Sequence, residues 1–565
     1  MTPLPASMSQ RQNRIMTLLW LASALFALAG LATMFLLSPK VLYADTWRFT
    51  GHFLSTAWPG KVLDADNGHR EILPNLLRVA ELHWLDGNQW LQIAVGAALA
   101  CATIAVLANA IRCETEPALA KSAALLLAVI GIFWLGNMRS LAHGNESVHA
   151  YLVMLCLVSG SWILSGARSD RSAGSLSAVM ALGLIATFSF GSGIACFAAF
   201  VGVLLLRRAP WKSVALIAAA AVAAAALHLA LGNSGLGSFL RLAPAEQVPT
   251  LLRWLAAPFI YAGWPLLEPR VAAAIPVDLV RAPFQAMAQA YESAFGSVML
   301  ARWPHVLVGL AGLVWLVVAS QACYRRPQRL RTELLGLAMA WFAVTVGVLI
   351  AATRAGYFIQ HPSQVVATRY LPWSTLFWAG LAMSAVIRSK AHQVDRGAFA
   401  SLMIAALLVP SQLWMAGLAY HTRSTAELTA LGVAVGVIDS ASEWGESVPA
   451  EIQTTRPLLQ RAQTSVFAWP ETLAMGTLVT SVPAVAVTDL QLRPVANALG
   501  KPGFAVSFQL SGSPCTRLVV LSAEGLVSGM ARQDRPGHWQ GWAQASAGAQ
   551  PRIAALCGLP LAVAD

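Results

Sequence analysis

The chain has 565 residues, of which 57% are hydrophobic and only 11% are charged, and its mean hydropathy is +0.61. Soluble domains carry roughly 25% charged residues, so this composition excludes a soluble protein and indicates that lipid surrounds much of the chain. The net charge of +12 comes from short basic blocks between apolar runs, which is typical of membrane orientation signals and argues against a nucleic-acid partner.

Apolar runs long enough to cross a bilayer recur along the chain, and such a crossing needs about 20 residues. The first run follows Arg11 and Arg14 and is too long for the core of a signal peptide, so we interpret it as a retained helix. The runs lie near residues 15–37, 90–111, 119–137, 148–166, 212–231, 303–322, 334–352, 371–388 and 397–418.

The stretch 175–207 is too long for one span, and Phe188-Ser-Phe-Gly-Ser-Gly193 interrupts it. Basic residues flank it on both sides, Arg171 before it and Arg207 after it. Because both flanks are expected in the cytoplasm, we predict two short helices that turn at the glycines. The fold class predicted is therefore a polytopic α-helical membrane protein with about 11 transmembrane helices and a cytoplasmic N-terminus.

The predicted membrane domain covers residues 1–418, with a first outer loop at 38–89 and a second long outer loop at 232–302. Within the second loop, the segment 251–267 is either an interfacial helix or a short re-entrant pair. Residues 419–565 are expected to form a small α+β periplasmic domain.

The tail is predicted to begin with a helix near Ser424–Val437 and to continue with short strands such as Arg517-Leu-Val-Val-Leu-Ser522. Cys515 and Cys557 are the two cysteines of this polar region, and an oxidising compartment favours a disulfide between them. No cysteine or histidine spacing indicates a metal site, and no cofactor is predicted.

A first polar cluster follows the first span directly. The segment Tyr43-Ala-Asp-Thr-Trp-Arg-Phe49 places Asp45 and Arg48 at the outer membrane surface. A carboxylate there can serve as a general base. The structural alternative is that Asp45 caps a short interfacial helix and Trp47 anchors it in the headgroup region.

The same loop continues with Asp64-Ala-Asp-Asn-Gly-His-Arg-Glu71, which concentrates His69, Arg70 and Glu71. Apolar residues at helical spacing follow in 72–84 and predict an amphipathic helix that lies on the membrane. The alternative for the polar run is a solvated turn before that helix.

Two further clusters lie on outer loops. Arg139-Ser-Leu-Ala-His-Gly-Asn-Glu-Ser-Val-His149 offers His143, Asn145 and Glu146, either for substrate or for ordinary hydrogen bonding. The second cluster contains Arg354, His361, Arg369 and Tyr370. Arginine can clamp a phosphate while tyrosine adds a hydroxyl donor; snorkelling to lipid headgroups is the alternative.

With these clusters the sequence resembles the GT-C superfamily of membrane glycosyltransferases, which use polyprenyl-phosphate sugars. The segment ADTWRF matches the acidic position after the first span, NGHREILPNLLRVAELHWL is similar to an HNxHR stretch of bacterial polysaccharide proteins, and TRYLPW resembles the start of a late span. The resemblance covers roughly residues 10–420. Many members carry two consecutive acidic residues, whereas Asp45 is followed by Thr46.

The resemblance implies an inverting glycosyltransferase of the bacterial inner membrane that acts on the periplasmic face. It would transfer a sugar from a polyprenyl-phosphate-linked donor to a glycan or lipid acceptor. Asp45 would be the general base, and Arg48, Arg70, Arg369 and Tyr370 would bind the donor phosphate. The acceptor would be oriented by His69, Glu71, His143, Asn145, Glu146, Arg354 and His361.

Two other classes of protein remain open. An O-antigen-type polysaccharide polymerase or ligase also uses arginine and histidine in outer loops, but usually has a large periplasmic loop between late spans. A transporter or flippase would bury charged residues near the middle of the bilayer. The predicted spans are almost free of charge at their centres.

Overall fold

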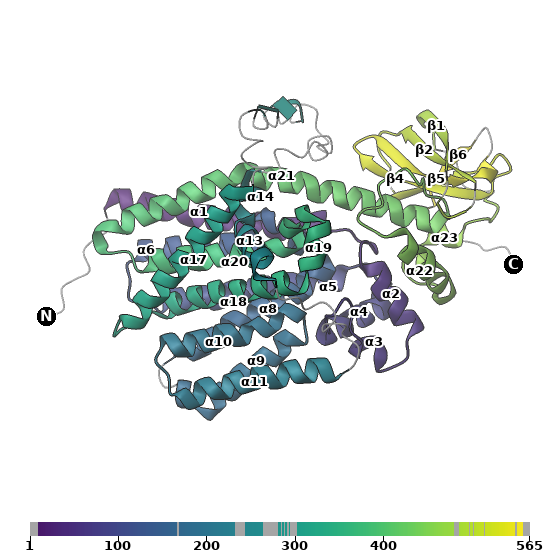
Figure 1. Ribbon diagram of the computed structural model, residues 1–565. Coiled ribbons are helices and arrows are strands. Elements are labelled where there is room, and N and C mark those ends of the chain that lie inside the picture. The colour runs from purple at the N-terminus through teal and green to yellow at the C-terminus, as the bar shows by residue number, and fades with distance from the viewer. Residues whose placement is uncertain are drawn as a thin grey trace.

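The computed structural model shows a mostly helical protein with a small β domain at one end (Figure 1). The helices of the bundle run roughly parallel or antiparallel to one another. The structure describes residues 9–166, 169–231, 243–263, short pieces between 281 and 293, 302–479, and 485–556 apart from 497, 501, 514 and 548–550.

Among the described residues, nine helical segments are long and apolar enough to span a membrane. Several begin or end with short 3-10 or π turns, as at Thr33–Leu37 and Leu135–Asn137. The helices concerned are α1 (Gln10–Ala32), α5 (Trp90–Arg112), α6 with α7 (Ala118–Phe133 and Met138–Leu141), α8 (Gly144–Ser165), α11 (Trp211–Ala230), α17 (Arg302–Arg325), α18 (Arg331–Thr353), α20 (Leu371–Ile387) and α21 (Val394–Val435).

The stretch predicted to cross twice forms two shorter apolar helices, α9 (Ala173–Thr187) and α10 (Ala195–Leu206). They are joined by a 3-10 turn at Gly191–Ile194. A Cβ atom at Gly193 would overlap the backbone carbonyl of Ala186, so only glycine lets the turn fold back this closely on α9. Together with the nine longer helices, this hairpin confirms a polytopic helical membrane protein with the predicted number of apolar helices.

The first outer loop folds into three helices at the end of the bundle that carries the β domain. They are α2 (Thr46–Ser55), α3 (Gly60–Leu63) and α4 (Ile72–Leu85). Helix α4 exposes Leu73, Leu76 and Trp84 while it buries Asn75 and Arg78 toward the protein. An exposed apolar face beside a buried polar one suits a helix that lies on a membrane.

The segment around residue 255 forms two helices, α13 (Pro244–Leu255) and α14 (Ala257–Gly263). Trp254 packs close to Gly347, six residues before the end of α18, and the carbonyl of Leu255 accepts a hydrogen bond from Trp378 at 2.7 Å. At 1.5 Å per residue, this packing lies about 9 Å inside the end of α18, which favours the re-entrant pair. Residues 264–267 lie outside the described residues.

Helix α21 is the longest element, with 42 residues, and runs along the bundle into the β domain (Figure 1). The sequence predicts two helices here, near 397–418 and Ser424–Val437, but the structure joins them. The predicted domain boundary at 418 therefore falls inside α21. Helix α21 ends at Gly436, which adopts the left-handed conformation that glycine allows at a helix C-terminus.

Beyond α21 the chain forms α22 (Pro449–Ala462), α23 (Pro470–Leu473) and a six-stranded antiparallel sheet in the order β1-β2-β5-β4-β3-β6. One face packs on α21, where Trp542 donates a hydrogen bond to the Leu428 carbonyl. The strands are β1 (Thr488–Val495), β2 (Gly503–Gln509), β3 (Arg517–Leu521), β4 (Val527–Arg535), β5 (His538–Gln544) and β6 (Arg552–Ala554).

The strands and helices confirm the predicted small domain of mixed helix and sheet. Cys515 precedes β3 and is disulfide-bonded. Its predicted partner, Cys557, lies outside the described residues, so that pairing stays a prediction. The five free cysteines all lie in the membrane domain: Cys101, Cys113, Cys156, Cys196 and Cys323.

Candidate functional site

A cavity of about 720 Å³ lies where the bundle meets the first outer loop and the segment that follows α21. Residues from several outer loops, which are far apart in the sequence, line it together. The predicted site residues among them are Asp45, His69, Glu71, Asn145, Glu146, Arg354, Arg369 and Tyr370. Four other predicted site residues, Arg48, Arg70, His143 and His361, do not line it.

Asp45 stands at the first position before α2, where a carboxylate could cap the helix. It makes no side-chain capping hydrogen bond. Its Oδ1 instead accepts a hydrogen bond from Nη1 of Arg48 at 3.2 Å, and 46% of the side chain is exposed. The capping alternative therefore fails, and the carboxylate is available to a ligand in the cavity.

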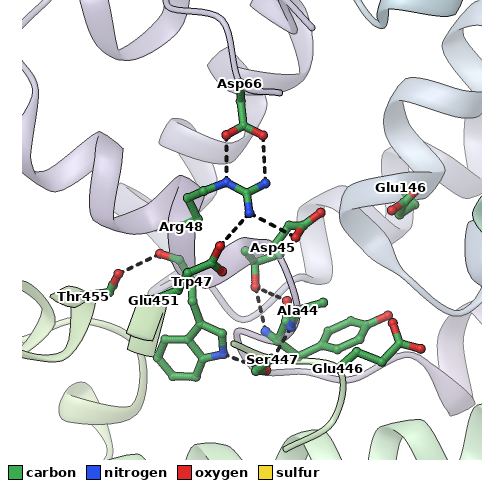
Figure 2. A network of polar contacts seen from close by, with 12 residues as sticks. Ala44, Asp45, Trp47, Arg48, Asp66, Glu146, Glu446, Ser447, Glu451 and Thr455 are labelled. Atoms are coloured by element: carbon green, nitrogen blue, oxygen red, sulfur yellow. Dashed lines mark hydrogen bonds and ion pairs between the residues drawn. The ribbon is translucent and has the colours of Figure 1, made fainter. Parts of the chain in front are cut away.

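Arg48 is held by three carboxylates rather than by a free anion site (Figure 2). It donates two hydrogen bonds to Asp66 at 2.8 Å and one to Glu451 at 2.7 Å, besides the bond to Asp45. Partial burial opposes its charge, but these carboxylates raise the pKa of Arg48 above its ordinary value. A guanidinium so fully paired has little capacity left for a phosphate, so this pairing does not favour the predicted donor-binding role.

Arg70 is also a structural residue. Its guanidinium is buried and donates to the carbonyls of His228 at 3.0 Å and Leu63 at 2.6 Å. His228 returns a contact to the Gly68 carbonyl at 3.2 Å. Arg70 thereby ties the first outer loop to the end of α11, where backbone carbonyls lack helical partners, and does not reach the cavity.

His143 and His361 also differ from their predicted roles. The buried ring of His143 stacks on Tyr43, with centroids 4.2 Å apart, and its Nδ1 accepts the Glu146 backbone N–H at the start of α8. Burial, reinforced by Arg139, lowers the pKa of His143 well below its ordinary value, so it is a neutral helix cap. His361 is exposed beside Tyr357.

His69 faces the cavity and stacks on Phe190, with ring centroids 4.4 Å apart. Phe190 also stacks on His149, at 4.2 Å. Burial, reinforced by the charge of Arg354, lowers the pKa of His69 to about 4 against the opposing effect of Glu71. The ring is therefore neutral near pH 7, and its buried Nδ1 has no hydrogen-bond partner among the described residues.

A chain of charges runs beneath the cavity. Arg78 contacts Glu71 at 2.5 Å, and Nδ1 of His149 lies 3.6 Å from the same carboxylate. His149 then contacts Glu146 at 3.4 Å through Nε2. Burial alone would raise the pKa of Glu71, but Arg78 and His149 hold it at about 2. Glu71 is consequently a paired structural carboxylate.

Arg139 continues this chain toward the C-terminal domain. Its Nε lies 3.3 Å from Glu146, and its Nη1 forms an ion pair with Glu446. The pair joins the α7–α8 region to the segment after α21. Asn145 lies in the same corner, and its Oδ1 is buried without a hydrogen-bond partner among the described residues.

The cavity lining also contains two arginines of a different kind. Arg354 follows α18, and Arg369 lies in the turn before α20. Among the described residues, neither has a carboxylate within 4 Å: Arg369 donates to Gln364 at 3.1 Å and lies over the ring of Tyr370. Guanidinium groups without anionic partners are suited to bind an anion.

The deeper part of the cavity is apolar. Helices α11 and α18 contribute Leu229, Val346, Leu349 and Ile350 to its lining. These side chains lie toward the C-terminal ends of two membrane-spanning helices. The cavity therefore combines a polar region with a wall that suits a hydrocarbon chain.

Several lining residues escaped the sequence analysis: Asp66, Arg139, His149, His228, Tyr357, Trp373 and Glu446. Asp66, Arg139 and His149 belong to polar runs that were singled out as clusters, so the signal was present without a role attached. Glu446 lies in a tail that offered no motif, and only its packing against the first outer loop reveals it. Among the described residues, no group of three or more histidine, cysteine, aspartate or glutamate side chains is placed to hold a metal ion.

No family model and no curated protein matches this chain. Among solved structures, the chain is similar to the oligosaccharyltransferase of Archaeoglobus fulgidus, solved in complex with zinc and sulfate. The sequences are 13% identical, the TM-score is 0.33, and the match covers 75% of this chain and 56% of that one. A similarity this low does not assign a function.

Proposed function

We propose that this protein is an inverting glycosyltransferase of the GT-C type, which transfers a sugar from a polyprenyl-phosphate donor to an envelope glycan or lipid-linked acceptor. The observation that carries the proposal is the distribution of charged and apolar side chains around the cavity. Asp45 lies on one wall, and Arg354 and Arg369, which lack carboxylate partners among the described residues, lie on another. Apolar side chains of two membrane helices complete the lining.

The two arginines suit the phosphate of the donor. Each guanidinium can give two parallel hydrogen bonds to phosphate oxygens, and Tyr370 adds a hydroxyl beside Arg369. The prenyl chain would lie along the apolar wall formed by α11 and α18. Arg354 thereby takes the donor role that the sequence analysis gave to Arg48 and Arg70.

The reaction would be a single displacement. Asp45 removes the proton from an acceptor hydroxyl, whose oxygen attacks the anomeric carbon of the donor sugar. The bond from that carbon to the phosphate oxygen breaks, and its electron pair leaves with the polyprenyl phosphate. One displacement inverts the anomeric configuration. Arg354 and Arg369 would stabilise the negative charge that develops on the leaving phosphate.

The cavity would open on the periplasmic side of a bacterial inner membrane, with the N-terminus in the cytoplasm. Support comes from the opposite end of the bundle, where arginines of the short loops gather. Glu333 there contacts both Arg326 and Arg388, at 2.7 Å each. Reporter fusions after Asp565 and near Arg329 test this orientation, and a cytoplasmic signal from Asp565 would contradict it.

The function is tested with the purified full-length protein in lipid nanodiscs. A panel of undecaprenyl-phosphate-linked and undecaprenyl-diphosphate-linked sugars is offered together with soluble neutral, amino and acidic trisaccharides, and release of undecaprenyl phosphate or undecaprenyl diphosphate is measured. We expect at least one donor to be consumed with an inverted linkage in the product. Consumption of diphosphate-linked donors alone would instead indicate a polymerase or ligase, and no consumption of any donor would overturn the proposal.

A further inference from the structure

The segment after α21 lies directly on the loop that carries Asp45. We call residues 445–451 the C-terminal strap. Tyr43, Ala44 and Trp47 of the first outer loop are buried in one apolar core with Ala426 of α21 and Ile452 of α22. The Asp45 loop is thus built into the core of the C-terminal domain rather than only into the bundle.

Hydrogen bonds fix this contact (Figure 2). Ser447 of the strap accepts from the Ala44 backbone N–H at 3.0 Å and from the indole N–H of Trp47 at 3.1 Å. Thr455 of α22 donates to the Trp47 carbonyl at 2.9 Å. Because these bonds flank Asp45 in the sequence, the C-terminal domain sets where its backbone lies.

Two carboxylates of the strap reach the site itself. Glu451 contacts Nη1 of Arg48 at 2.7 Å, the same nitrogen that contacts Asp45. Together with Asp66, Glu451 fixes the guanidinium in one orientation. Without Glu451, Asp66 would still hold Nε and Nη2 of Arg48, but Nη1 would lose its second carboxylate and could turn fully onto Asp45, where it would cover the oxygen needed for proton transfer.

Glu446 lines the same cavity as Asp45 and is 46% exposed. Its ion pair with Arg139 orients the side chain and leaves much of the carboxylate surface accessible. The backbone at Glu446 has φ of 63°, a left-handed conformation that costs a non-glycine residue free energy.

We propose that the C-terminal strap completes the acceptor side of the cavity, with Glu446 binding the acceptor and Glu451 acting as a positioning residue for Arg48 and Asp45. The proposal rests on the proposed glycosyl transfer. Carboxylates accept hydrogen bonds from hydroxyl and ammonium groups and repel anions. The acceptor is therefore a neutral or amino sugar rather than an acidic one.

The first experiment uses Glu446→Gln in the nanodisc assay, with the most active donor and soluble neutral, amino and acidic trisaccharides. We expect the acceptor concentration at half-maximal rate to rise about 10-fold, the usual loss for one hydrogen bond to a charged group, while the maximal rate changes less than about twofold. The matched control is Glu443→Gln, which removes a carboxylate of similar exposure (49%) that contacts His421. Its kinetics should equal those of the wild type.

The second experiment uses Glu451→Gln. We expect the maximal rate to fall about 10-fold while the half-saturating concentrations of donor and acceptor stay constant, because the variant disturbs the base and not the binding groups. Glu451→Asp should recover part of the rate. The control is Glu427→Gln, a carboxylate of similar burial that contacts Arg423 and Arg532 away from the cavity.

Ser447→Ala tests whether Glu446 binds the acceptor itself or only holds the C-terminal strap against the first outer loop. The variant removes the two hydrogen bonds of Ser447 but keeps both carboxylates. One outcome is that Ser447→Ala raises the half-saturating acceptor concentration as much as Glu446→Gln does. In that case Glu446 acts only by holding the strap in place, and the proposal is wrong. Stimulation by acidic trisaccharides alone would also overturn it. A wild-type protein that consumes no donor would instead contradict the proposed function, so the two failures are distinguishable.

Discussion

The two charged walls of the cavity differ in how their arginines are paired. On the wall formed by the first outer loop, α8 and the C-terminal strap, Arg139 contacts carboxylates, and so do Arg48 and Arg78, which belong to the same segments but do not line the cavity. On the wall at the ends of α18 and α20, Arg354 and Arg369 contact none among the described residues. Charges that are paired and largely buried hold segments together, whereas cations left without anions in a concave site are available to a ligand.

The largest effect is expected on turnover when Asp45 is changed, because this carboxylate of the paired wall remains available to substrate. Asp45→Asn keeps the shape of the side chain but cannot accept a proton. Turnover should fall by about 10²–10⁴-fold, the usual contribution of a positioned base. Undecaprenyl phosphate should still bind, because the arginines of the other wall are intact. Full activity of this variant at matched protein levels would remove Asp45 from the mechanism.

The paired wall should respond to charge removal with loss of stability. Glu71→Gln would leave the buried guanidinium of Arg78 without its carboxylate. A buried charge that loses its partner lowers the free energy of unfolding by about 3–5 kcal/mol. Thermal unfolding in detergent measures the change. The double variant Glu71→Leu with Arg78→Leu removes both charges, so neither is left without its partner, and it should recover part of the lost stability. An unchanged unfolding temperature for Glu71→Gln would show that this pair does not stabilise the fold.

The unpaired wall should respond with loss of binding. Arg354→Ala should weaken undecaprenyl phosphate binding about 10- to 100-fold, the range for hydrogen bonds to a charged group. The unfolding temperature should not fall, since no ion pair with a described residue is broken. Titration of the lipid against intrinsic tryptophan fluorescence gives the dissociation constant.

Two variants control this measurement. Arg354→Lys keeps the charge without the paired hydrogen bonds and should bind with intermediate affinity. Arg461→Ala removes an exposed arginine of α22 that does not line the cavity, and this variant should bind like the wild type. If Arg354→Ala binds the lipid normally but unfolds at lower temperature, Arg354 belongs with the paired arginines.

The sequence predicts the apolar helices well because their signal is local. A run of about 20 apolar residues has few alternatives to a membrane-spanning helix, and the glycines around Gly193 mark the turn between α9 and α10. The sequence does not predict the continuity of α21, because the polar residues after 418 are typical of the end of a span. A helix can leave the membrane without ending, as α21 does when it enters the C-terminal domain.

The site was predicted only in part, because residue type and loop position do not specify pairing. Arg48, Arg70 and Arg369 are equivalent in the sequence, yet one is held by three carboxylates, one by backbone carbonyls, and one has neither kind of partner among the described residues. Glu451, which distinguishes Arg48 from Arg369, lies 403 residues from Arg48 along the chain. Such long-range contacts become visible only in the folded protein.

The smallest effect concerns how His69 makes the stability of the protein depend on pH. This effect depends most on the cavity as a whole. Burial lowers the pKa of His69 to about 4 in the folded protein, while an unfolded histidine has a pKa near 6.5. Between these values the unfolded chain binds more protons, so acidification favours unfolding. The stabilising contribution of neutral His69 is fully present above about pH 6.5 and is lost as the pH falls toward 4.

Over this pH range the loss should reach about 1–3 kcal/mol, given 1.36 kcal/mol per pKa unit and the part of the ring that stays accessible. The measurement is the unfolding temperature of wild type and His69→Gln at pH 7 and pH 5. His69→Gln cannot take up the proton, so its unfolding temperature should fall less than that of the wild type between these pH values. Because the charge of Arg354 also lowers the pKa of His69, undecaprenyl phosphate bound between the walls should raise that pKa and reduce the pH dependence. Equal pH dependence of both proteins, with and without the lipid, would show that His69 is exposed to solvent and does not sense the unpaired wall.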